Sequence, residues 1–246
     1  LARAQALVEK LNLLGAYVTR TRRVQVKEQR PLREPQALLV RYSPEERQLY
    51  DAILGLVRRK CRADKRPFHV FHVMGLQLRA ASCLPAIAAE IRAGRLGDPG
   101  EILAEALGEN VVDEGDGPVD EPALGVEELP KILDYDFERN DSKYRELRRL
   151  LLEQIPNDKV VLFSFYHASL RYLVRRLSED GIAVALIHGK MPNEERLAEI
   201  EKVRESASRM VLLSSEVGSE GLDLQFCRVV VNYDLPWNPM EVEQRI

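Results

Sequence analysis

Residues 210–246 read MVLLSSEVGSEGLDLQFCRVVVNYDLPWNPMEVEQRI, and this stretch decides the fold. Two strongly β-forming runs, Met210–Leu213 and Val229–Val231, each lead into polar and turn-forming residues. Short apolar runs of this kind are typical of buried parallel strands. Functional residues in open parallel sheets lie at the carboxyl ends of the strands. Two hydroxyls and two glycines follow the first run: Ser214, Ser215, Gly218 and Gly221.

The preceding 50 residues continue the pattern toward the N-terminus. Val160–Phe165 and Ile182–Ile187 are predicted strands, and amphipathic helices are predicted after each of them. We expect Gly181 to end the first of these helices and Asn193 to cap the second. Strands that alternate with helices predict an α/β fold, with a parallel sheet covered by helices on both faces and right-handed crossovers.

The first 140 residues read mostly as helices. Ser43 and Pro44, followed by two glutamates, predict a helix start, and Asp141–Ser142 predict another that runs to about Gln154. Leu38–Val40 is predicted to form a strand. An acidic stretch near residues 108–125 carries six acids and no base, which indicates a mobile surface loop. We divide the chain into residues 1–42, a mostly helical insertion over 43–140, and an α/β domain over 141–246.

Composition excludes several classes of protein. Of 246 residues, 45% are hydrophobic and 30% charged, with a net charge of −3, as expected of a packed soluble protein. No apolar run approaches the roughly 20 residues of a membrane helix. Three widely spaced cysteines indicate neither disulfides nor a zinc site, which suits a reducing cytoplasm. His69 and His72 lack a third ligand at a known spacing, so no metal site is predicted.

Residues 214–246 resemble motif V and the start of motif VI of the superfamily-two helicases, above all the Swi/Snf-type ATPases of the RapA-type branch. The matching residues, in order and spacing, are Gly218, Gly221, Asp234, Trp237-Asn238-Pro239 and Gln244. Phe163-Ser164-Phe165 resembles motif IV of this family. Two positions depart from the family pattern, because Leu84 stands in place of a histidine and Asp223 in place of a frequent asparagine.

The resemblance implies the second RecA-like lobe of a motor that binds ATP and Mg²⁺ between two lobes and nucleic acid across both. It implies that the residues facing the nucleotide are Glu220, Gly221, Asp223 and Gln244. It implies that the residues contacting nucleic acid are Ser164, His188, Gly189, Arg196, Ser214, Ser215 and Gly218. A basic cluster that includes Arg59 and Arg62 reads equally well as a phosphate contact and as a solvated helix end.

The chain carries no Gly-x-x-x-x-Gly-Lys phosphate loop. The arginine fingers that the resemblance implies are expected after Ile246, so no catalytic residue is assigned. We therefore expect a fragment of a longer protein, one that binds no ATP or Mg²⁺ and hydrolyses no ATP alone.

The resulting expectation is part of an ATP-dependent double-stranded DNA translocase or remodelling helicase. Its expected location is a bacterial-type cytoplasm, associated with the nucleoid, with RNA polymerase or another protein complex as a partner. Two alternatives stay open. One is a non-catalytic nucleic-acid or protein interaction module with the shape of a helicase lobe. The other is an unrelated α/β enzyme, which requires His188, Asp223 and Asp234 to converge.

Overall fold

A computed structural model describes residues 34–63, 69–93, 134–215 and 222–235, apart from the side chains of residues 56–63 and 69–74. The chain divides into two units, residues 1–38 and residues 39–246. Of the first unit only residues 34–38 are described, and they form neither helix nor strand. The helices within the described ranges are all too short or too polar to span a membrane. The acidic stretch near 108–125 lies outside these ranges, and the proposed domain boundaries stay predictions.

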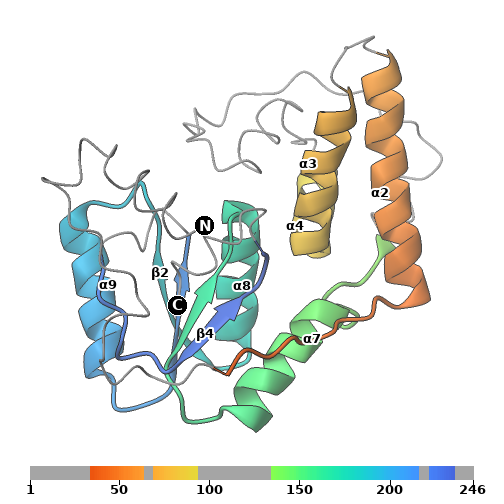
Figure 1. Cartoon of the computed structure of the whole chain (residues 1–246). Helices are drawn as coiled ribbons and strands as arrows, with labels where there is room; N and C mark the ends of the chain where they lie inside the picture. Colours follow the sequence, from red (N-terminus) through yellow and green to blue (C-terminus); the bar gives the residue numbers. More distant parts are fainter. Residues whose placement is uncertain (1–33, 64–68, 94–133, 216–221, 236–246) are drawn as a thin grey trace, which may run out of the picture. The chain divides into compact units, whose positions relative to one another are not determined.

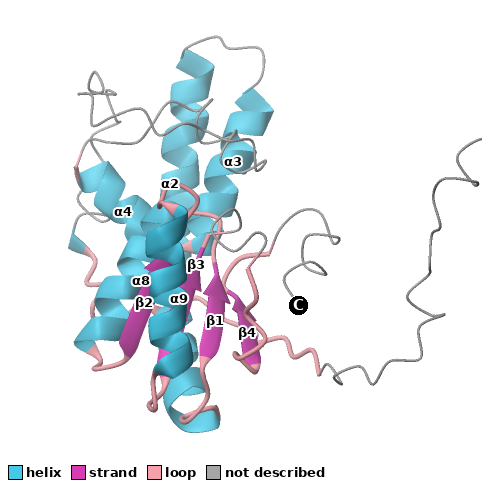
Figure 2. Ribbon diagram, turned by 90° about the vertical axis from the view of Figure 1, so that its left-hand side faces the viewer, coloured by secondary structure: helices cyan, strands magenta, loops and turns pink. Residues whose placement is uncertain are grey.

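The centre of the second unit is a parallel sheet of four strands in the order β2-β3-β1-β4 (Figure 2). The strands are β1 (Val160–Phe163), β2 (Ala183–Ile187), β3 (Met210–Ser214) and β4 (Val229–Asn232). The register pairs Phe163 with both Ser214 and Asn232, and Ser214 with Ile187. The last residues of all four strands are therefore level, so the segments that follow them meet at one edge of the sheet, here called the carboxyl edge.

Helices cover both faces of this sheet, as predicted. Val160 and Leu162 of β1 pack with Leu173 of α8 (His167–Glu179), whereas the alternate residues Val161 and Phe163 pack in a separate cluster with Ile200 of α9 (Asn193–Glu205). Figure 1 shows α8 and α9 on opposite sides of the strands. Since successive side chains of a strand point to opposite faces, the continuous apolar runs read from the sequence are those of strands buried on both sides.

The predicted end of the helix after β1 is confirmed. Gly181 follows α8 with φ of 71°, a left-handed conformation that glycine adopts without steric cost. The amide of Gly181 donates to the carbonyl of Ser178 at 3.0 Å, and the amide of Ile182 donates to that of Leu177 at 2.9 Å. These are the two bonds of a Schellman motif.

The predicted cap at Asn193 is wrong. Pro192 precedes the helix with φ of −54° and ψ of 146°, and Asn193 is already the first helical residue. Its side-chain oxygen accepts from the guanidinium of Arg196 rather than from a backbone amide. Pro192, in an extended conformation, occupies the N-cap position. The helix therefore begins one residue earlier than the polar side chain of Asn193 suggested.

The helical part comprises α2 (Pro44–Ala63), α3 (His69–Ser82) and α4 (Leu84–Arg92). The predicted start at Ser43 is confirmed as a capping box: the Glu46 amide donates to Ser43 Oγ at 3.1 Å, and the Ser43 amide donates to Glu46 Oε2 at 2.7 Å. The predicted strand at Leu38–Val40 is wrong, because these residues are irregular and the Leu39 side chain is 85% exposed. An apolar run makes a strand only where another strand pairs with it.

Glu46 also joins the helical part to the α/β domain. Its Oε1 accepts from the Ser142 amide at 2.7 Å and its Oε2 from Ser142 Oγ at 2.5 Å, and only 1% of the residue is exposed. Ser142 is the first residue of α7 (Ser142–Arg149), which continues as a π-helical turn, η2 (Leu150–Gln154). Asp141 caps α7 as predicted, since its side chain accepts from the amides of Lys143 and Tyr144. Glu46 thus caps two helices at once.

We predict that Glu46→Ala lowers the free energy of unfolding by about 3 kcal/mol, because it leaves buried amide and hydroxyl donors without an acceptor. Urea denaturation monitored by circular dichroism measures this. Glu45→Ala, at an exposed position of the same turn, is the matched control and should stay within about 0.5 kcal/mol of the parent. Equal losses in the two variants would contradict the bridging role of Glu46.

Candidate functional site

The carboxyl edge is closed by backbone hydrogen bonds that extend one residue beyond the strands. The Ser164 amide donates to the carbonyl of Ser214 at 3.1 Å, the Ser215 amide donates to that of Ile187 at 3.2 Å, and the Tyr233 amide donates to that of Phe163 at 2.9 Å. The structure therefore brings the predicted residues Ser164, Ser214 and Ser215 together at this edge, where parallel sheets hold their functional groups.

The hydroxyls of Ser164 and Ser214 are used within the protein interior. Ser164 and Ser214 are fully buried, and 6% of Ser215 is exposed. Ser164 Oγ donates to Asp234 Oδ2 at 2.6 Å, and Ser214 Oγ donates to the carbonyl of Ser215 at 2.7 Å. A hydroxyl has one proton to donate, so neither of these two hydroxyls has a proton left for a phosphate oxygen.

Two exposed or half-exposed predicted residues follow β2. Gly189 is exposed, and the half-buried His188 packs its ring edge-on against His167, the first residue of α8, with 5.5 Å between ring centroids. His188 Nδ1 is buried and has no hydrogen-bond partner among the described residues. Burial lowers the pKa of His188, the cation of Lys190 lowers it further, and Glu195 opposes both. Arg196, in the first turn of α9, is half-buried.

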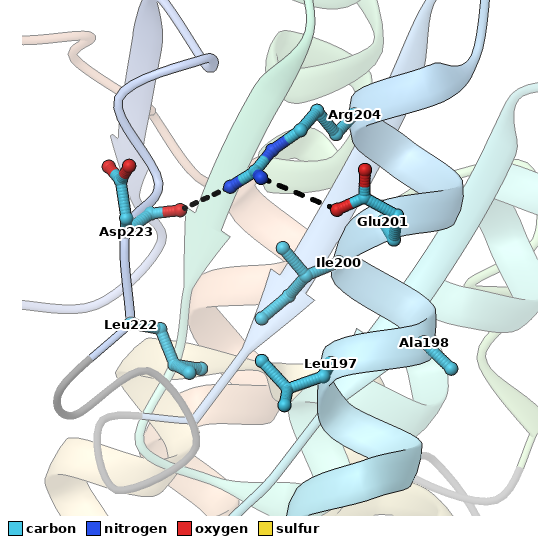
Figure 3. A pocket seen from close by; sticks show the side chains of 7 residues that line it. All are labelled: Leu197, Ala198, Ile200, Glu201, Arg204, Leu222 and Asp223. Atoms are coloured by element: carbon cyan, nitrogen blue, oxygen red, sulfur yellow. Dashed lines mark hydrogen bonds and ion pairs between the residues drawn. The ribbon is translucent and has the colours of Figure 1, made fainter.

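Asp223 lies elsewhere, beside α9 (Figure 3). Its Oδ1 accepts from the Gln225 amide at 3.1 Å, and its backbone carbonyl accepts from the guanidinium of Arg204 at 3.5 Å. A shallow groove of about 470 Å³ separates this segment from α9 and is lined in part by Leu197 and Leu222. Asp223 is the only described member of the four residues predicted to face the nucleotide, and one carboxylate of this kind makes no nucleotide or Mg²⁺ site.

The remaining predicted site residues fall outside the described ranges. Gly218, Glu220 and Gly221 lie between β3 and Leu222, and Gln244 follows Leu235. Arg59 and Arg62 belong to the backbone of α2, but their side chains are not described.

The unrelated α/β enzyme required three side chains to converge, and the structure gives them separate surroundings. Asp234 Oδ1 and Oδ2 bind the amide of Phe165 and the hydroxyls of Ser82 and Ser164. His188 packs against His167, and Asp223 lies beside Arg204. Among the described residues, His188, Asp223 and Asp234 share no hydrogen-bond partner, so they form no catalytic triad.

Sequence reasoning missed Ser82, which donates to Asp234, and Lys143, which donates to the carbonyl of Ser82. Ser82 ends α3, far from Asp234 in the chain, and Lys143 lies in the first turn of α7. No spacing or periodicity links these positions, because their proximity depends on how the helical part packs. The only sequence signal was a carboxylate at the end of a predicted strand.

Comparison with known proteins finds a matching family for part of the chain. Residues 142–246 match the family described as the helicase conserved C-terminal domain. The match begins at the first residue of α7 and includes every described strand, so the carboxyl edge lies within the matched residues.

The matching relatives are longer proteins than this chain. The uncharacterized ATP-dependent helicase YqhH of Bacillus subtilis is 28% identical over 216 residues, 87% of this chain and 34% of YqhH. The ATP-dependent RNA helicase DBP8 of Saccharomyces cerevisiae is 33% identical over 90 residues, 37% of this chain and 21% of DBP8. The chain thus spans about a third or less of these relatives. The crystal structure of the Pyrococcus furiosus Hef helicase domain shares the fold, with a TM-score of 0.50 and 18% identity over 84% of this chain and 50% of that one.

We predict that His188 titrates below 6.5, its ordinary pKa, because burial and Lys190 disfavour the cation. An NMR titration of the imidazole resonances measures this. The unfolded chain takes up this proton at higher pH than the folded one, so His188 destabilises the fold as pH falls below 6.5. His188→Gln should reduce the loss of stability in that window. A pKa of His188 in the folded chain that equals or exceeds its pKa in denaturant would contradict the prediction.

Proposed function

We propose that the chain is the second-lobe part of an ATP-dependent helicase or translocase of the Swi/Snf type, in the RapA-type branch, acting on double-stranded DNA. The observation that carries the proposal is the level carboxyl edge of the sheet, within a helicase C-terminal domain, beside the exposed Gly189 and the half-buried Arg196. The resemblance of the motifs at residues 163–165, 188–196 and 214–246 supports the Swi/Snf assignment.

The buried hydroxyls refine the proposed roles. Ser164 and Ser214 hold the edge together, whereas the turn at His188–Gly189 and the cation of Arg196 contact the phosphate backbone. Ser215, Gly218, Arg59 and Arg62 remain proposed contacts. Phosphate contacts position a protein on nucleic acid without reading bases, which suits a machine that moves along it. ATP and Mg²⁺ would bind between this lobe and a first lobe, with Glu220, Gly221, Asp223 and Gln244 facing the nucleotide.

The expected chemistry in the whole protein is phosphoryl transfer to water, in which positioning and charge supply most of the catalysis. Hydrolysis would open and close the cleft between the two lobes and so shift their grip on DNA. A nucleoid-associated cytoplasmic protein that works with RNA polymerase or another complex is consistent with this proposal. The alternative is a non-catalytic interaction module with the same lobe shape.

We expect the chain to bind fluorescein-labelled duplex DNA, with an affinity that falls as salt rises. Arg196→Ala should weaken binding equally for different sequences and reduce the salt slope by about one, because one phosphate contact is lost. Fluorescence anisotropy from low to moderate salt measures both effects. The double variant Arg59→Glu and Arg62→Glu tests the basic cluster of α2 in the same assay.

Arg204→Ala is the matched control, since Arg204 lies on the same helix but binds the Asp223 carbonyl and Glu201. It should leave DNA affinity unchanged. Equal effects of the Arg196 and Arg204 variants would refute the proposed contact, and absence of duplex binding would refute the DNA-binding function. Tighter binding of duplex RNA would assign the protein to RNA instead.

We also predict that the purified chain hydrolyses no ATP, with or without duplex DNA. It has no Gly-x-x-x-x-Gly-Lys loop, and the arginine fingers worth roughly 10³–10⁵ in rate are not among its assigned residues. Phosphate release measured with a colorimetric assay tests this. Turnover that co-purifies with the monomeric chain would contradict it. ATP hydrolysis by a longer chain that contains a phosphate loop would favour the motor over the non-catalytic module.

A further inference from the structure

A carboxylate and three serines tie the end of α3 to the carboxyl edge. Asp234 Oδ2 accepts from Ser82 Oγ at 2.7 Å and from Ser164 Oγ at 2.6 Å, while Oδ1 accepts from the Phe165 amide at 2.9 Å. Ser82 Oγ also lies 3.0 Å from Ser169 Oγ. Because the single proton of Ser82 is donated to Asp234, Ser169 is the donor in the second pair. Asp234 therefore collects bonds from α3 and from the segment that follows β1.

Lys143 makes a second connection at the same place. Its Nζ donates to the carbonyls of Ala81 and Ser82 at 3.1 and 2.7 Å, and lies 4.0 Å from the centroid of the Tyr233 ring. A cation at the last carbonyls of a helix is favourable. Burial lowers the pKa of Lys143, and the charge of Asp234 opposes this change. Two contacts thus hold the end of α3. Lys143 binds the carbonyls of Ala81 and Ser82, and Asp234 binds the Ser82 hydroxyl.

The helices behind this connection form one body. Leu49 and Ile53 of α2, Leu76 of α3 and Ile87 of α4 share a single core cluster. Cys83, next to Ser82, and Ala86 belong instead to the core of the α/β domain. A displacement of α2, α3 and α4, here called the helical segment, therefore reaches the Ser82 hydroxyl, and through Asp234 it reaches Ser164 and Phe165.

We propose that Asp234 is a positioning residue through which the helical segment sets the geometry of the carboxyl edge, and thereby the affinity of the protein for nucleic acid. The effect on affinity rests on the proposed function, whereas the coupling itself does not. Ser82 is only 1% exposed, so it acts through Asp234 and not by direct contact with nucleic acid. The helical segment is then a control element of the edge and not merely an insertion beside it.

The test compares Ser82→Ala with Ser169→Ala in the 246-residue chain. The two serines are equally buried, at 1% and 2% exposure, and each variant removes one hydroxyl of the same cluster. Only Ser82→Ala removes a bond to Asp234, because Ser169 donates to Ser82. Three readouts are needed: unfolding by urea, amide hydrogen exchange by NMR, and anisotropy with duplex DNA.

Ser82→Ala should speed exchange of the Phe165 amide by roughly tenfold, the size expected for a weakened bond to a carboxylate. The Ile182 amide, which donates to Leu177, is the internal reference and should not change. DNA affinity should fall at least roughly fivefold, the lower end of typical coupling between sites. Ser169→Ala should change neither Phe165 exchange nor affinity, although it lowers stability to a similar extent.

Equal effects of both variants on Phe165 and on affinity would show that the cluster only stabilises the fold, and would overturn the proposal. Unchanged Phe165 exchange in Ser82→Ala would overturn it as well. If the parent chain binds no DNA but Ser82→Ala still exposes the Phe165 amide selectively, the coupling stands and the proposed nucleic-acid function fails.

Discussion

The register of the parallel sheet is the constraint on which the rest of the structure depends. Phe163, Ser214, Asn232 and Ile187 end their strands at the same level, so the following segments meet at one edge. A shift of one residue in any strand would turn its side chains to the opposite face and mix the two clusters that separate α8 from α9. Burial on both faces therefore specifies the register strongly, and the register in turn places the edge.

Two buried carboxylates, Glu46 and Asp141, and the half-buried Asp234 then connect the helices with one another and with this sheet. Glu46, Asp141 and Asp234 each accept several hydrogen bonds, from donors that come from different elements. Asp141 binds the amides that start α7 and also the hydroxyl of Tyr172 in α8 at 2.6 Å. Burial raises its pKa, and the bonds from Tyr144 and Tyr172 oppose this change. Groups that are expensive to bury are kept where several donors are satisfied together, which defines the geometry more sharply than apolar contact does.

Much of the α/β domain was predictable from sequence, because its signals are local. The apolar runs at Val160, Ala183, Met210 and Val229 mark strands, and Gly181 marks a helix end, since each depends only on neighbouring residues. Leu38–Val40 failed because a strand also needs a partner, and Asn193 failed because Pro192 competed for the same position. The parallel direction of the strands followed from the alternation of strands and helices.

The candidate site was only partly predictable. Motif resemblance indicated the serines at the strand ends, but it did not indicate that the hydroxyls of Ser164 and Ser214 are used internally. The contact of Ser82 with Asp234 bridges 152 residues and depends on the packing of separate helices. No pattern within one segment reports a contact of that range. The position of Asp223 beside α9 was not predictable for the same reason, because the contact of its carbonyl with Arg204 joins two separate elements.

The turn after α8 limits how this protein can diverge. A side chain at position 181 would meet nothing within 4 Å, so space is not the obstacle there; the positive φ of 71° is. Asparagine tolerates that left-handed conformation and is the replacement to expect in natural variants. Valine, isoleucine or threonine would be strained at this φ although space is free, so the constraint on position 181 is backbone conformation alone.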